Sequence, residues 1–166
     1  MRAMLKGHER LVYNVAFSPN GRSLVSASYD CSVRIWNIRD GSSRVLPVTG
    51  SPNLFLSVVF SSDGRYIAAG NYDNSFWIWD SRTHRLMAKW LGHRNSVWCA
   101  VFTPDGKGLM GGSYDKKVKY WDVSSLGNRR GVSTGTVVNE EDSFPLVRTF
   151  LGHDVCCPLP LSCNVN

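Results

Sequence analysis

The sequence of 166 residues lacks long apolar runs and the short motifs of common catalytic sites. No run is long enough for a membrane helix, and the amino terminus lacks the apolar core of a signal peptide. The P-loop pattern G-x-x-x-x-G-K-[ST] and the zinc pattern H-E-x-x-H are missing, and no G-x-G-x-x-G follows a strand in the dinucleotide-binding context. We therefore expect neither catalysis nor membrane association.

Cysteine usage and charge also argue against a metal site, a disulfide framework and direct nucleic-acid binding. The five cysteines are scattered and form no C-x-x-C pair, so we expect no metal site, no disulfide framework and no cofactor. Lysine and arginine exceed the acidic residues by 19 to 13, a net charge of +6 that favours solubility and weak attraction to polyanions. The basic residues around Lys116 to Lys119 alternate with apolar ones, as on a solvated strand, so direct nucleic-acid binding is not expected.

The sequence does contain three copies of a repeat. Trp36, Trp79 and Trp121 are 43 and 42 positions apart, within the period of a propeller blade. At nineteen, fifteen and six residues before each tryptophan stand a phenylalanine, a glycine and an aspartate: Phe17, Phe60, Phe102; Gly21, Gly64, Gly106; Asp30, Asp73, Asp115. Gly-His precedes the first and third copies, Gly50-Ser51 replaces it in the second, and Gly152-His153 opens a fourth.

Alternating apolar residues between proline and glycine turns predict four strands in each copy. The predicted strands are 12–17, 23–27, 32–38 and 44–48; then 55–60, 66–69, 75–79 and 85–90; then 97–102, 108–112, 117–121 and 146–151. The apolar first strand of each copy is expected to be buried on both sides. Residues 124–143 are predicted to form a loop insertion, and Pro158 and Pro160 predict an irregular, disordered tail over 155–166.

The Gly-His, Asp-turn and Trp-Asp pattern resembles the WD-repeat family. The resemblance implies an all-β fold: a partial β-propeller of about three four-stranded blades plus the opening of a fourth repeat. It places the propeller in residues 1–154, with repeats at about 5–48, 49–90 and 91–151. Because closed propellers need at least four blades, we expect open blade edges and self-association through them.

The resemblance also implies a structural rather than catalytic role for the recurring polar residues. They would form hydrogen-bonded tetrads that join the Gly-His loop, the Asp turn and the indole N–H. A catalytic triad is the less favoured interpretation, because the same set recurs at the same offsets. The expected tetrads are His8, Ser28, Asp30 and Trp36, and His93, Ser113, Asp115 and Trp121; Ser51 and Asn71 interrupt the pattern in the second copy.

The family's geometry assigns a second group of residues to the top rim around the channel mouth. Most are aromatic or aliphatic where a solvated loop would be polar, and tyrosine and tryptophan are common at binding hot spots. The predicted protein-binding top face consists of Leu11, Tyr13, Tyr29, Leu54, Leu56, Tyr72, Trp98 and Tyr114. The alternative is that individual rings pack between neighbouring blades.

Among WD-repeat proteins, the text GHERLVYNVAFSPNGRSLVSASYDCSVRIWNI and the copy lacking Gly-His resemble fungal Tup-type corepressors, relatives of Groucho. This likeness implies a fragment of a carboxyl-terminal propeller with a scaffolding function. Its expected partners are DNA-bound repressors and other corepressor subunits, and its expected location is the nucleus. The alternative is a cytoplasmic WD-repeat adaptor, such as a ubiquitin-ligase substrate receptor or a signalling scaffold.

Overall fold

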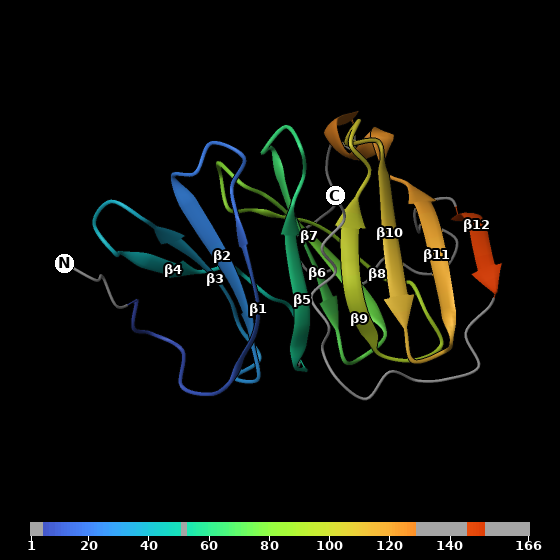
Figure 1. Cartoon of the computed structure of the whole chain (residues 1–166), viewed down its shortest axis with the longest axis horizontal. Helices are drawn as coiled ribbons and strands as arrows, with labels where there is room; N and C mark the ends of the chain where they lie inside the picture. The colour runs from blue at the N-terminus through green and yellow to red at the C-terminus, as the bar shows by residue number, and fades with distance from the viewer. Residues whose placement is uncertain (1–4, 51–52, 129–145, 152–166) are drawn as a thin grey trace.

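The computed structural model describes residues 5–50, 53–128 and 146–151, which form three four-stranded antiparallel sheets (Figure 1). In each sheet the strands follow chain order. The strands of the first two sheets are β1 Val12–Phe17, β2 Ser23–Ser28, β3 Val33–Asn37 and β4 Ser43–Val45, then β5 Phe55–Phe60, β6 Tyr66–Asn71, β7 Ser75–Asp80 and β8 Leu86–Leu91.

The third sheet contains β9 Val97–Phe102, β10 Gly108–Ser113, β11 Lys117–Asp122 and β12 Leu146–Leu151. The predicted bounds of β1, β5, β9 and β12 coincide with the observed ones, whereas β4 is shorter than predicted. The predicted loop insertion begins with a 3-10 helix at Ser124–Asn128, because Leu126 is buried in the core. The rest of that insertion, the Gly152-His153 opening and the tail over 155–166 lie outside the described residues.

The β1–β2, β5–β6 and β9–β10 turns share one construction. Gly21, Gly64 and Gly106 have φ values of 67°, 71° and 69°, a backbone conformation that favours glycine. One residue earlier, a side-chain oxygen of Asn20, Asp63 or Asp105 accepts a hydrogen bond from the backbone N–H two residues on. This turn chemistry fixes the register of each hairpin, and explains why the sequence predicted the hairpins well.

The sheets pack face to face through two apolar cores. Their first strands lie side by side, β1 next to β5 and β5 next to β9 (Figure 1). The core between the first two sheets is built around Phe55, Trp77 and Trp79, and the core between the last two around Phe76, Trp90 and Trp121. The predicted partial propeller of successive four-stranded blades is confirmed, and the three sheets are called blades 1, 2 and 3 below.

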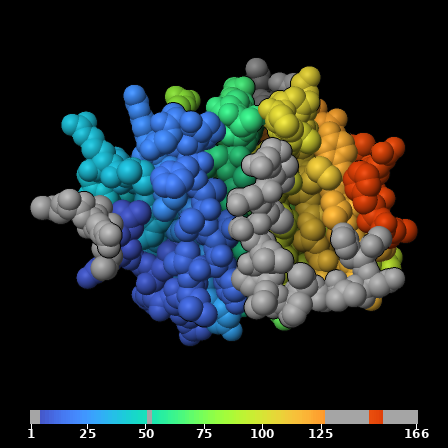
Figure 2. Space-filling view, viewed as in Figure 1, coloured from blue at the N-terminus to red at the C-terminus, as the bar shows by residue number. Residues whose placement is uncertain are grey.

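Among the described residues, the two outer blades leave one face each without a neighbouring blade. Blade 1 and β12 lie at opposite edges of the molecule (Figure 2). Contrary to the prediction that each first strand is buried on both sides, Val15 and Phe17 of β1 are 53% and 65% exposed. The reason is geometric: these side chains point away from blade 2, and no described blade packs against that side of blade 1.

Candidate protein-interaction face

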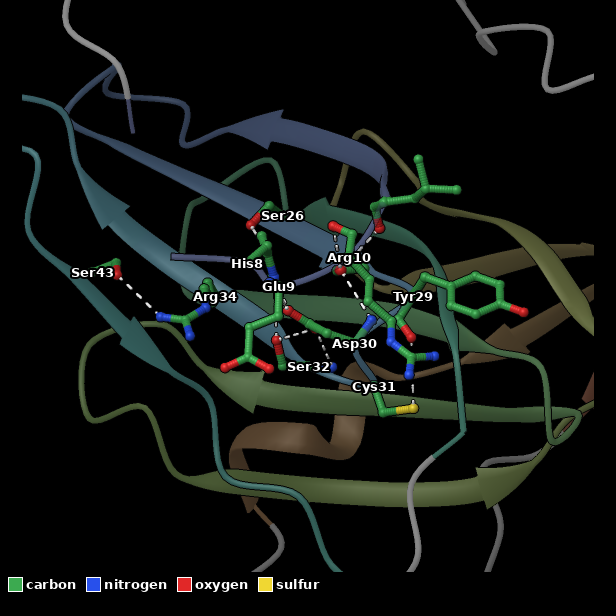
Figure 3. Close-up of polar contacts among 12 residues, drawn as sticks. His8, Glu9, Arg10, Ser26, Tyr29, Asp30, Cys31, Ser32, Arg34 and Ser43 are labelled. Carbon is green, nitrogen blue, oxygen red and sulfur yellow. Dashed lines mark hydrogen bonds and ion pairs between the residues drawn. The ribbon is translucent and has the colours of Figure 1, made fainter. Parts of the chain in front are cut away.

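Blade 1 contains a chain of hydrogen bonds that joins its loops to its tryptophan. Figure 3 shows His8, Ser26 and Asp30, which form the loop end of this chain. The His8 ring contacts the Asp30 carboxylate through Nδ1 at 2.7 Å and the Ser26 hydroxyl through Nε2 at 2.6 Å. The Trp36 indole N–H donates to the same Ser26 oxygen at 2.7 Å. His8 and Asp30 are nearly buried, so the chain is shielded from water and rigidifies the loop.

The predicted role of Ser28 in this chain is corrected by the geometry. The Ser26 hydroxyl lies between the His8 ring and the Trp36 indole. Ser28 is the last residue of β2 and pairs with Val12 of β1. Ser28 donates instead to the Leu11 carbonyl at 2.9 Å and accepts from the Asp30 N–H. Ser113 plays the same part in blade 3, where it donates to the Asn95 carbonyl and accepts from the Asp115 N–H.

The ionised form of Asp30 is strongly favoured. Burial opposes ionisation, but hydrogen bonds from Ser32 and His8 outweigh it and lower the pKa of Asp30 to about 2. A carboxyl with a depressed folded-state pKa stabilises the fold above its unfolded pKa of 3.8, and this stability is lost as the pH falls toward 2.

We therefore expect Asp30→Asn to flatten the acid dependence of stability. The ionised carboxylate should contribute on the order of 2 kcal/mol to the free energy of unfolding at neutral pH. Urea unfolding of wild type and variant from pH 5 to pH 2 measures it. Wild type should lose more stability than the variant over this interval, and equal slopes would contradict the assignment.

Blade 3 has the same histidine and aspartate but a different third partner. The His93 side chain is fully buried; its Nδ1 lies 2.8 Å from the Asp115 carboxylate and its Nε2 lies 3.1 Å from the Gly111 carbonyl. Gly111 occupies the position of Ser26 in blade 1, so no hydroxyl is available at this point. Burial lowers the pKa of His93 below its usual value, although Asp115 opposes that shift.

Replacing His93 with alanine should lower the free energy of unfolding by about 1–3 kcal/mol. The neutral His93 ring has one N–H, and whichever of the buried Asp115 and Gly111 oxygens accepts from it would lose its donor. His84→Ala, in the turn before β8, is a suitable control because His84 takes no part in a tetrad. Thermal unfolding measures both variants. An unchanged midpoint for His93→Ala would contradict the structural role.

Blade 2 replaces the missing histidine with a lysine. The Lys89 ammonium lies 3.3 Å from the Asp73 carboxylate and 4.4 Å from the centre of the Trp77 ring. Ser75 donates to Asp73 and accepts from the Trp77 indole N–H, so this blade has its own polar chain. The sequence offered no signal for it, since Lys89 lies in the outer strand, outside the repeated offsets.

Four of the predicted rim residues form one aromatic cluster. The Tyr13 and Tyr29 rings of blade 1 are stacked, with centroids 6.0 Å apart, and the Trp98 and Tyr114 rings of blade 3 meet edge to face at 4.9 Å. Tyr13 and Trp98 join the two pairs at 6.3 Å across blade 2. We call Tyr13, Tyr29, Trp98 and Tyr114 the rim cluster.

The other predicted rim residues differ in accessibility. Leu11 and Tyr72 are 71% and 48% exposed, and Leu54 is half-buried. Leu56, at the position of Tyr13 and Trp98 in blade 2, is only 5% exposed and so supports the rim from below. Sequence reasoning missed Arg10, whose guanidinium lies 5.8 Å from the centre of the Tyr29 ring.

The described residues contain no group of three or more metal-ligating side chains. Likewise, no helix in this part of the chain is long and apolar enough to cross a membrane. The blades, their polar chains and the aromatic rim define a propeller-type scaffold for protein interaction. The WD40 repeat family (WD domain, G-beta repeat) matches residues 1–37, 44–80 and 84–122, and the chain belongs to this non-catalytic family.

Solved structures and curated proteins extend this comparison. The chain is similar to two solved structures, RRP9 WD40 repeats (TM-score 0.74, 27% identity) and U3-55K (TM-score 0.74, 28% identity). Each match covers 90% of this chain, and 41% and 42% of the solved chains.

Two curated relatives match over about one repeat. Ribosome assembly protein 4 of Saccharomyces cerevisiae is 56% identical over 39 residues, which are 24% of this chain and 8% of the relative. Ribosome biogenesis protein bop1-A of Xenopus laevis is 53% identical over 36 residues, 22% and 5% of the two lengths. The prediction of a closer likeness to Tup-type corepressors is wrong, because the names of these relatives refer to ribosome assembly.

Proposed function

We propose that this protein is a non-catalytic scaffold of ribosome assembly that holds a protein partner on its aromatic rim. The assembly role is supported by the names of the relatives that share its repeat. The net charge of +6 is also suited to a particle rich in RNA, since it adds attraction to polyanions without base recognition. A nuclear location, as predicted from the sequence, is compatible with this role.

The rim cluster is the observation that carries the choice of binding face. Aromatic side chains bury a large area on binding while they lose little conformational entropy, and they dominate many interaction hot spots. Here rings from blades 1 and 3 converge on one surface.

Sedimentation of a tagged chain through a sucrose gradient tests the assembly role. In extract of cells that express it, the chain should move with precursor ribosomal particles and return to the top of the gradient when those particles are dissociated. A chain found only at the top, with a folded melting profile, would contradict the role in ribosome assembly.

A further inference from the structure

The two open faces at the ends of the molecule have the composition of the two sides of a blade junction. We define the receiving face as the side of blade 1 that points away from blade 2. It is formed by Val12, Val15, Phe17 and Leu24, with the buried Ser26 and Trp36 at its base. We define the donating face as the side of blade 3 that points away from blade 2, formed by Val101, Met110, Val118, Tyr120 and Phe150.

The receiving face is formed by residues whose equivalents in the other two blades are buried. Val12, Val15 and Phe17 are 47%, 53% and 65% exposed. The equivalent residues of blade 2, Phe55, Val58 and Phe60, are 0%, 3% and 8% exposed, and those of blade 3, Val97, Ala100 and Phe102, are 0%, 8% and 7% exposed. These residues are apolar in all three blades and are buried wherever a preceding blade is present, so the receiving face is suited to pack against a blade.

The donating face shows the same difference on the opposite side. Phe150 pairs with Val118 in the third sheet as Trp90 pairs with Phe76 in the second. Trp90 is 1% exposed in the core between blades 2 and 3, whereas Phe150 is 42% exposed. Val101 is likewise 37% exposed, although its counterpart Val59 packs against that core.

Side-chain sizes at one position of each junction are matched, a large residue on one blade against a small one on the next. In the core between blades 1 and 2, Val33 of blade 1 and Ala69 of blade 2 belong to the same cluster. Between blades 2 and 3 the larger Phe76 is combined with Gly111, which leaves room for its ring. The equivalent residues on the open faces are Val118 and Ser26, so this chain's own donating face repeats the combination of valine with a small residue.

We propose that the occupant of each open face is a second copy of this chain, joined head to tail. The donating face of one protomer would pack on the receiving face of its partner, and the reverse contact would close the pair. Two chains would contribute six blades around one channel, within the roughly four to eight blades of known propellers. A hollow of about 450 Å³, lined by Val12, Val15 and Trp36 among others, receives side chains of the partner.

The closed pair, unlike other assemblies, requires both the receiving and the donating face of each protomer. A head-to-tail contact uses two different faces of each protomer, so damage to either face breaks both contacts of a closed pair. A symmetric contact between two receiving faces, by contrast, would not depend on the donating face. An open head-to-tail chain would grow without a defined size.

Light scattering on the purified chain, combined with sedimentation velocity, tests the proposal. Wild type should have twice the mass of one chain, in a single species. Val15→Glu on the receiving face and Val101→Glu on the donating face should each shift that species to the mass of one chain, because each buries an uncompensated carboxylate. Leu91→Glu, exposed at the edge of blade 2, is the matched control and should remain a dimer.

Circular dichroism of each variant keeps the result interpretable, since both substitutions are at exposed positions of folded strands. Three outcomes would overturn the proposal: a folded wild-type monomer, a polydisperse wild-type assembly, and a dimer that survives Val101→Glu. A dimer broken by both face variants and kept by Leu91→Glu supports it.

Discussion

Replacing Phe76 with alanine is expected to lower the free energy of unfolding by about 3–5 kcal/mol, the range for a fully buried phenylalanine. Phe76 is 0% exposed and lies at the centre of the core between blades 2 and 3. Its ring is stacked on Trp90 at 5.2 Å and meets Trp121 edge to face at 5.0 Å. Removing it would leave a cavity bounded by two rigid indoles, which cannot collapse to fill it.

Urea unfolding followed by tryptophan fluorescence measures this effect. Leu91→Ala, at an exposed site on the edge of blade 2, is a useful control and should cost less. If Phe76→Ala cost under about 1 kcal/mol, the two blades could not be packed through this ring.

Gly111→Ala is expected to cost about 3 kcal/mol, near the upper end of the range for overpacking. A Cβ atom at Gly111 would lie 2.2 Å from the Phe76 ring and 3.1 Å from Nε2 of His93. The ring cannot move away easily, because Trp90 and Trp121 hold it. The backbone of Gly111 needs no special φ angle, so the cost is one of space alone.

A second substitution should recover part of this loss. Phe76→Val combined with Gly111→Ala recreates the valine and alanine found in the core between blades 1 and 2. The double variant should therefore be more stable than the sum of the two single effects by about 1–3 kcal/mol, as measured in a double-mutant cycle. Strict additivity would contradict the direct contact between Phe76 and Gly111.

The strand pattern was predictable from the sequence because its causes are local. Alternation and the glycine turns at Gly21, Gly64 and Gly106 fixed the hairpins, and the described parts of all twelve strands lie close to their predicted positions. β12 was also predicted, although a long insertion separates it from β11. Its apolar alternation alone was enough.

The polar chains were harder to predict because spacing does not say which hydroxyl lies between two rings. Ser26 and Ser28 both point to the same side of β2, and only the three-dimensional position of Trp36 selects Ser26. Lys89 pairs with Asp73 from another strand, so no fixed offset could identify it.

The rim was predicted as a set of residues but not as a surface. The contact of Tyr13 with Trp98 depends on the curvature of three blades, which brings these two rings within 6.3 Å although β5 lies between strands β1 and β9. The exposure of β1 had the same origin. It depends on which blade packs against the strand, and not on the sequence of the strand itself.

Affinity capture with a rim variant tests the central claim that the aromatic rim holds the protein partner. The tagged wild-type chain and the triple variant Tyr13→Ala, Tyr72→Ala and Trp98→Ala are each incubated with cell extract, and recovered proteins are quantified. We expect recovery of the main partner to fall at least tenfold, about 1.4 kcal/mol, with the thermal midpoint of the fold retained. Equal recovery by the folded triple variant would contradict the claim.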